Sequence, residues 1–372
     1  MVADTKGNMS MKKRKVAIIT WHYYYNFGSA LQAYSLQESI KKLGHKVEIL
    51  NYRDTRFGKY SQNKLRIQSL LHLLFKNKND RFVYPFPYFQ EKYLQQTALV
   101  TDSRKLESIG RRFDTIICGS DQIWAPNALN PVYLIDFAPK KTEKVSYAAS
   151  IGLNDIPLEI QPVYRHALAD FKRVSVREEK SVEILKKYCG TQAEVVLDPT
   201  LLLTEKEWER IECPDNGLEN EKYIFCYFLK NNHEYKKSVV EFANNISARI
   251  IGFSANEADS TWMEIKKNIG PCEFLWLIHH ADTIITDSYH GTIFSLIYHK
   301  RFITIERFNA DEVICQNSRI DQLRSNFGLS NEIVPQNLPG KLCVADTDYS
   351  LFDEQLEKLR ESSISFLKEA LR

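Results

Sequence analysis

The regular alternation of short apolar strands with helical stretches constrains the fold of this chain more than any other feature. Strands buried on both faces read as continuous apolar runs, which is typical of parallel sheets in α/β proteins. A first series of such runs covers 15–20, 46–50, 113–118, 145–149, 173–176 and 195–197, and a second covers 223–229, 248–253, 283–286 and 302–305. The alternation predicts an α/β fold of two Rossmann-like domains with a central cleft.

The polar stretch 212–221 separates the two series and predicts the domain boundary. We expect a flexible leader at 1–14, an N-terminal domain at 15–210, a C-terminal domain at 220–340 and a C-terminal helix at 350–372 that packs back. A basic helical insertion is expected at about 57–100, because 57–82 carries six Lys or Arg against one Asp. Its basic face suits either plain solvent exposure or peripheral contact with an anionic membrane surface.

Composition excludes several classes of protein. A net charge of +3 over 372 residues does not indicate nucleic-acid binding, and no apolar run is long enough to span a membrane. The seven cysteines are scattered without a Cys-x-x-Cys spacing, so neither disulfides nor structural zinc is expected. No His, Asp or Glu set shows metal spacing, and His279 and His280 are interpreted as structural. We expect a cytoplasmic protein without a cofactor or metal.

The segment 283–294 predicts a strand, a turn and a helix that begins just before His290. Asp287 or Ser288 can cap this helix, which places His290 and Gly291 in its first turn. A helix N-terminus offers free N–H groups and partial positive charge, so it suits an anionic ligand. An imidazole in that turn puts a proton-transfer group beside the anion.

Two other loops follow strands of the first series. The loop at 21–29 is rich in aromatic residues, Gly28 permits close backbone approach, and Asn26 and Ser29 offer polar groups. The loop at 119–124 offers three polar side chains and an indole, from Ser120, Asp121, Gln122 and Trp124. These loops are candidates for sugar contacts, although simple turn and cap roles would also explain them.

Two arginines have two interpretations each. Arg177 ends the strand at 173–176, and Arg319 lies in the sequence Asn317-Ser-Arg-Ile320. A guanidinium at a strand end can hold a carboxylate or phosphate bidentately, or it can form an ion pair with a nearby acid of the protein.

In order along the chain, these motifs resemble the polysaccharide pyruvyl transferase family over residues 15–330. The resemblance rests on Asn26–Gln32, Gly119–Trp124, Ser146–Gly152, Ser175–Glu178, Asp198-Pro199, Gly270–Leu275 and Thr286–Phe294. It implies a GT-B-like pair of Rossmann-like domains. It also implies transfer of a carboxyethylidene (pyruvyl) group from phosphoenolpyruvate to two sugar hydroxyls of a bacterial surface or capsular polysaccharide precursor. Many members carry Arg two positions before the key histidine, where this chain has Ser288, and Arg319 or Arg307 could replace that charge.

The functional hypothesis assigns each candidate residue a role. His290 and Asp121 are the expected catalytic residues. Donor contacts are assigned to Arg177, Ser288, Tyr289, Gly291 and Arg319, and acceptor contacts to Asn26, Gly28, Ser29, Ser120, Gln122 and Trp124. The expected partners are phosphoenolpyruvate and a sugar acceptor, with a lipid-linked oligosaccharide and a location at the inner membrane face as further options. The alternatives are a GT-B glycosyltransferase that uses a nucleotide sugar, and a glycan-binding module without activity.

Overall fold

The computed structural model describes residues 12–54, 85–215, 217–230, 235–254, 257–308, 315–336, 342, 344 and 346–372. Most of the expected leader and the part of the basic insertion up to residue 84 lie outside these residues. The remainder of that insertion includes helix α4 (Pro85–Tyr93). Among the described helices, none has the length and apolar character required to cross a membrane.

The N-terminal domain contains a five-stranded parallel sheet in the order β2-β1-β3-β4-β5. Its strands are β1 (Lys15–Ile19), β2 (Lys46–Ile49), β3 (Thr115–Cys118), β4 (Glu143–Ser146) and β5 (Phe171–Arg173). A short parallel pair, β6 (Ser175–Val176) and β7 (Glu194–Val195), extends this layer through a bridge between Ala149 and Val176. The run expected as one strand at 173–176 is therefore two short strands.

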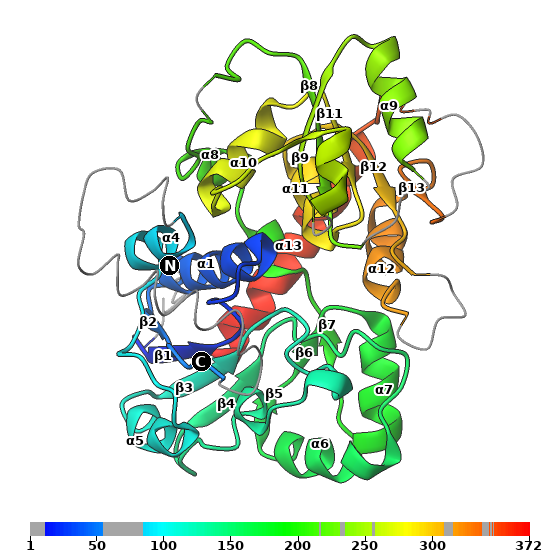
Figure 1. Ribbon diagram of the computed structural model, residues 1–372. Helices are drawn as coiled ribbons and strands as arrows, with labels where there is room; N and C mark the ends of the chain where they lie inside the picture. The colour runs from blue at the N-terminus through cyan, green and yellow to red at the C-terminus, as the bar shows by residue number, and fades with distance from the viewer. Residues whose placement is uncertain are drawn as a thin grey trace, which may run out of the picture.

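The helices of this domain are α1 (Phe27–Lys42), α5 (Leu106–Gly110), α6 (Gln161–Leu168) and α7 (Glu179–Cys189). In Figure 1, α1 lies on the side of the sheet that faces the other domain. The short helix α8 (Glu205–Glu209) follows the domain and leads into the segment that connects the two halves.

The C-terminal domain contains a six-stranded parallel sheet in the order β10-β9-β8-β11-β12-β13. Its strands are β8 (Tyr223–Phe228), β9 (Arg249–Ser254), β10 (Glu264–Ile265), β11 (Thr283–Thr286), β12 (Arg301–Ile305) and β13 (Ile333–Val334). Its helices are α9 (Lys236–Asn245), α10 (Pro271–His280), α11 (Tyr289–Ile297) and α12 (Ser318–Phe327). Two parallel, helix-covered sheets confirm the predicted α/β, Rossmann-like fold class.

One hydrophobic core runs through both domains. The Phe27 ring of α1 stacks on the Phe274 ring of α10, with centroids 4.5 Å apart and an interplanar angle of 7°. Both rings belong to a single buried cluster that includes residues of both sheets. An apolar interface of this kind limits relative motion of the domains and holds the loops at their junction in place.

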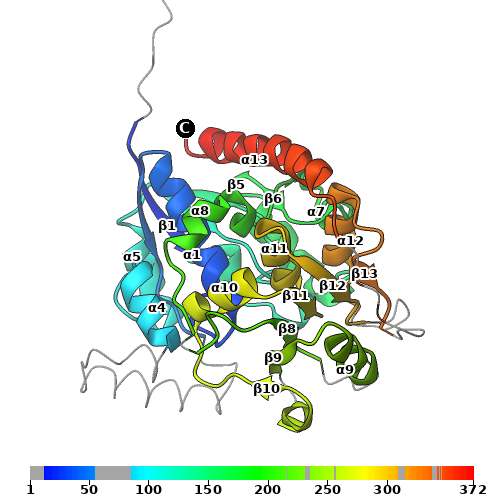
Figure 2. The ribbon, with the colours of Figure 1, turned by 90° about the horizontal axis from the view of Figure 1, so that it is seen from above.

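Helix α13 (Ser350–Ala370) lies across both domains (Figures 1 and 2). Phe352 at its start packs against Phe327 of α12, with ring centroids 4.8 Å apart. Further along, the Ser363 hydroxyl oxygen accepts a hydrogen bond from the Leu197 N–H at 3.0 Å, and Phe366 lies near Tyr147. The helix therefore ties the C-terminal domain back to the N-terminal one.

Candidate active site

A cavity of about 330 Å³ lies between the two domains, where loops follow the carboxyl ends of β1, β3, β11 and β12. Cavities of about 300–1,000 Å³ are the usual size for small-molecule sites, and this edge of a parallel sheet is where ligands bind. The N-terminal domain lines it with Trp21, Tyr24, Asn26, Ser29, Asp121 and Gln122. The C-terminal domain lines it with Ser288, Tyr289, His290, Arg307 and Arg319.

His290 occupies the first turn of α11, as the local pattern predicts. Ser288 is the N-cap, and its hydroxyl oxygen accepts a hydrogen bond from the Gly291 N–H at 3.3 Å. The Asp287 carboxylate accepts instead from the N–H groups of Leu229 and Lys230, at 2.7 and 2.8 Å. The turn that presents His290 is therefore held from both sides by hydrogen bonds.

Gly28 brings α1 into direct contact with the His290 ring. A Cβ atom at Gly28 would lie 1.9 Å from His290 Nδ1 and 2.4 Å from its Cγ, far inside any normal contact. The prediction that Gly28 allows close backbone approach matches this geometry, although the approaching group is the histidine and Gly28 does not line the cavity. The first turns of α1 and α11 thus meet at the imidazole.

Asp198 lies next to His290 and does not line the cavity. Its Oδ2 is 3.7 Å from His290 Nε2, and its side chain is fully buried. Oδ2 also accepts hydrogen bonds from Ser120 at 2.9 Å and Arg177 at 2.7 Å. Burial alone would raise the pKa of Asp198, but the adjacent His290 and Arg177 bring that pKa well below its usual value. Asp198 is therefore a fixed negative charge beside the imidazole.

Arg177 belongs to this buried layer and does not line the cavity. Its guanidinium pairs with Asp198 and with Glu178, the latter at 3.2 Å, and lies over the Tyr289 ring at 4.4 Å. Of the two interpretations from sequence, the structure thus shows an ion pair with acids of the protein. Arg177 connects the charge of Asp198 to the aromatic ring that lines the cavity.

Among the described residues, the cations that line the cavity are Arg307 and Arg319, the candidates to replace the charge absent at Ser288. Within the described residues, Arg319 has no carboxylate partner. It donates to the Gln316 amide oxygen at 3.1 Å, and its Nε is buried without a hydrogen-bond partner. Burial and the charges of Arg177 and Arg307 lower the pKa of Arg319 to about 10. This mutual repulsion of cations would be relieved by a bound anion.

Arg307 follows β12 and is held by the turn before His290. Its Nη2 donates to the Asp287 carbonyl oxygen at 2.9 Å and lies 3.9 Å from that residue's carboxylate. Its Nε is buried without a hydrogen-bond partner within the described part of the chain. The guanidinium therefore keeps donor capacity for a ligand at the N-terminus of α11.

The opposite wall centres on Asp121. The Ser29 hydroxyl donates to Asp121 Oδ2, while Oδ1 accepts from the Gln122 N–H at 2.8 Å. Asp121 has a φ of 78°, in the left-handed region that non-glycine residues rarely adopt. Asn26 caps α1 by accepting from the Ser29 N–H at 3.0 Å. These contacts hold a carboxylate and two polar side chains at the rim.

The aromatic wall differs from the one expected. Trp124 is fully buried, and its indole N–H donates to the Tyr133 carbonyl at 2.9 Å, so it offers no stacking face to a ligand. On the N-terminal side, the cavity is lined by the rings of Trp21 and Tyr24, whose centroids lie 5.9 Å apart in an edge-to-face arrangement. Trp21 and Tyr24 therefore take the place in the site that Trp124 was expected to hold.

Two further residues that were predicted to contact substrate are buried beneath the cavity wall. Ser120 is fully buried and donates to Asp198, as described above. A Cβ atom at Gly291 would lie 2.5 Å from Thr286 Oγ1, so this glycine lets α11 pack closely on the end of β11. Both residues shape the site without lining the cavity. Asp198 was not assigned a role from spacing, because its relation to His290 arises only in the folded chain. Arg307 was considered only as a replacement for the charge absent at Ser288, and it lines the cavity.

Comparisons with solved structures show the same architecture. A UDP-GlcNAc 2-epimerase from Neisseria meningitidis bound to UDP-GlcNAc is 10% identical, with a TM-score of 0.51 over 96% of this chain and 99% of that one. A putative UDP-N-acetylglucosamine 2-epimerase from Listeria monocytogenes is 8% identical, with a TM-score of 0.50 over 96% and 91%. The two-domain fold is thus GT-B-like. At such low identity the likeness concerns the fold alone.

Sequence comparison identifies the family. A search of curated proteins found no match. The family model described as polysaccharide pyruvyl transferase matches residues 26–307, which include both sides of the cavity, His290 and the Asp198 cluster. The match covers most of the chain and ends at Arg307. The chain belongs to the polysaccharide pyruvyl transferase family.

Proposed function

We propose that this protein transfers a carboxyethylidene group from phosphoenolpyruvate to two hydroxyls of a sugar, with release of phosphate. The observation that carries the proposal is the cavity wall on which His290 lies beside Arg319, a cation without a carboxylate partner in the described chain. Phosphoenolpyruvate carries a carboxylate and a phosphate, and guanidinium groups bind both well. The N-terminus of α11 adds a further site for negative charge.

The reaction defines what the residues must do. One sugar hydroxyl adds to C2 of phosphoenolpyruvate as the methylene carbon C3 takes a proton and becomes a methyl group. The C2–O bond to phosphate then breaks, and a second hydroxyl adds to C2 to complete a cyclic ketal. Of the two hydroxyl protons, one balances the proton taken up at C3 and the other leaves with phosphate or solvent.

His290 is proposed to move the proton at C3 or to stabilise the leaving phosphate. Asp198 lies beside the imidazole, so its fixed charge stabilises a positive charge on that ring, as a buried carboxylate does in other acid–base pairs. Asp121, across the cavity, is the proposed base for an acceptor hydroxyl. A positioned acid or base of this kind contributes about 10²–10⁴-fold to a rate.

The acceptor is proposed to bind against the N-terminal domain. Trp21 and Tyr24 offer ring faces that suit the C–H surface of a sugar, and Asn26, Ser29 and Gln122 offer polar groups beside them. A lipid-linked oligosaccharide is one form this acceptor can take. Arg307 and Arg319 are left to bind the donor, so in this proposal the two substrates bind to opposite walls of one cavity.

Activity can be tested by incubating the protein with phosphoenolpyruvate and a panel of lipid-linked glycans. We expect phosphate release that depends on the glycan, and loss of most turnover in His290→Gln while the circular dichroism spectrum is retained. The glycosyltransferase alternative predicts instead that a nucleotide sugar is consumed. Near-normal phosphate release by His290→Gln would overturn the assignment of His290.

A further inference from the structure

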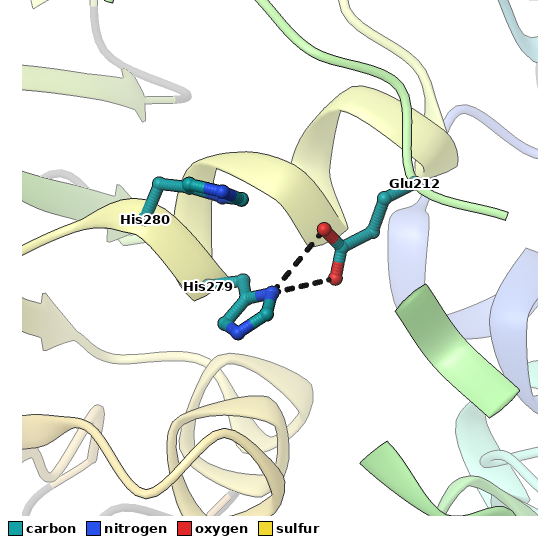
Figure 3. Close-up of side chains that lie close together, drawn as sticks. All are labelled: Glu212, His279 and His280. Carbon is teal, nitrogen blue, oxygen red and sulfur yellow. Dashed lines mark hydrogen bonds and ion pairs between the residues drawn. The ribbon is translucent and has the colours of Figure 1, made fainter. Parts of the chain in front are cut away.

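We propose that Glu212, His279 and His280 form a binding site for one divalent metal ion of the zinc type. The three side chains lie at the junction of the interdomain segment with the last turn of α10 (Figure 3). One potential ligand atom from each lies within 4.8 Å of the others. Two imidazoles and a carboxylate are ligands that zinc favours in proteins. The sequence did not suggest this site, because Glu212 and His279 are 67 positions apart.

The carboxylate and the first imidazole are already at coordinating separation. His279 Nδ1 lies 3.0 Å from Glu212 Oε1 and 3.3 Å from Oε2. Ligands about 2.0–2.2 Å from a tetrahedral ion lie roughly 3.3 Å from each other, so an ion can replace the shared proton with little movement. A ring nitrogen of His280, which is exposed, lies within 4.8 Å of the other two ligand atoms and has to come closer to complete the set.

The outer contact of the His280 ring matches that of a metal-bound histidine. Such a histidine usually donates its other ring N–H to a carbonyl or carboxylate, which fixes the ring. His280 Nδ1 lies 3.0 Å from the Trp276 carbonyl oxygen, which leaves Nε2 for the ion. His279 Nε2 lies 3.7 Å from the Glu205 carboxylate, which is longer than a hydrogen bond, and Nδ1 is the ring atom that faces Glu212.

Tyr298 packs against the His279 ring of the proposed site. The two rings stack with centroids 4.4 Å apart and an interplanar angle of 9°. The Tyr298 side chain is 3% exposed, so this contact is buried. Stacking limits rotation of the His279 ring and so keeps Nδ1 towards the Glu212 carboxylate.

The charge around the site favours a cation. Glu205, Glu209 and Glu212 converge on His279. One cation is nearby, because Lys300 Nζ donates to the His279 carbonyl oxygen at 2.8 Å, but it forms no ion pair with these three carboxylates. A divalent ion bound to Glu212 and His279 would neutralise part of this negative charge.

The proposed site is a structural metal site, separate from the cavity that His290 lines. It lies at the end of α10 that precedes β11, whereas His290 follows the opposite end of the same strand. An ion bound here would fasten the segment after α8 to α10 and so hold the connection between the domains. The expected benefit is stability of the folded chain.

The test is zinc binding by tag-free protein stripped with a chelator, measured by competition with a chromogenic zinc indicator. We expect one tight zinc ion per chain, a Kd raised at least about 10–100-fold in His280→Ala and in Glu212→Gln, and a zinc-dependent rise in melting temperature that both variants lose. His280→Ala is the main variant, because its exposed ring can be removed without disturbing the core. Co²⁺ in place of zinc should show visible absorption typical of a tetrahedral site.

Two matched controls make the result decisive. His166→Ala removes an exposed histidine from α6 and should leave zinc affinity unchanged. Glu209→Gln should also retain it, because Glu209 belongs only to the other group around His279. The proposal is overturned if the wild type binds no zinc, if His280→Ala binds as tightly as the wild type, or if Glu209→Gln loses the ion while His280→Ala keeps it.

Discussion

A single methyl group at Gly28 should disable the enzyme through His290. The Cβ of Gly28→Ala would lie 1.9 Å from His290 Nδ1, so the ring must move by about 1.5 Å to reach an ordinary contact of 3.4 Å. Misplacement of a catalytic group by about 1 Å can cost 10²-fold in rate. We therefore expect kcat/KM to fall by at least about 100-fold, which corresponds to roughly 2.7 kcal/mol of transition-state stabilisation.

The same substitution should leave folding intact. Gly28 lies within α1 and its φ is not positive, so alanine suits the backbone and improves helix propensity by about 0.5–1 kcal/mol. Gly110→Ala is the matched control, because its Cβ would lie no closer than 3.4 Å to any neighbour. Phosphate release from phosphoenolpyruvate and the thermal melting curve should be measured for both variants.

A double-mutant cycle then assigns the loss to the histidine. If Gly28→Ala acts by displacing His290, it should cost nothing further in a chain that already carries His290→Gln. Wild-type activity in Gly28→Ala, or a loss that adds fully to that of His290→Gln, would refute the reasoning.

Three further predictions concern buried ionisable side chains. Asp198→Asn removes one of the two carboxylates that pair with the buried Arg177 guanidinium. The free energy of unfolding in urea should therefore fall by about 3 kcal/mol, the lower end of the cost of breaking a buried pair, and turnover should drop with it; unchanged stability would contradict this. Arg319→Gln should raise KM for phosphoenolpyruvate by about 10–100-fold, which is what loss of a charge-assisted hydrogen bond costs in binding. Arg319→Lys should recover part of this loss. An unaltered KM in steady-state assays of Arg319→Gln would exclude Arg319 from donor binding. Burial lowers the pKa of His22 from 6.5 to about 4. The unfolded chain therefore binds a proton that the folded chain does not, and the free energy of unfolding should fall by roughly 3 kcal/mol as pH drops from 6.5 towards 4. Chemical denaturation across this range should show a shallower slope for His22→Gln, and equal slopes would count against the burial argument.

Much of the fold is readable from sequence because its strands are buried on both faces. The run 283–286 is observed as β11 without change, and 302–305 is observed as β12 with one more residue. The run at 173–176 divides in two, because β5 pairs with β4 whereas Val176 pairs with Ala149. That division depends on partners distant in sequence, which a local pattern does not contain.

The site was predictable only where its geometry is local. The Ser288 cap and His290 belong to one strand–turn–helix unit, so their relation follows from a few neighbouring residues. Asp198 reaches His290 only after two domains have packed together, so spacing gave it no role. Trp124 was misplaced for the converse reason: an aromatic ring after a strand can face either a ligand or the core, and here it faces the core.

The central claim is most directly tested by following carbon C3 of phosphoenolpyruvate. The substrate, labelled with ¹³C at C3, is incubated in D₂O with the protein and an accepting glycan, and the product is examined by NMR and mass spectrometry. Our account predicts one phosphate released per labelled ketal methyl group, with one solvent deuterium on that methyl and no product from His290→Gln. Label that remains in phosphoenolpyruvate while a nucleotide sugar is consumed would contradict the account.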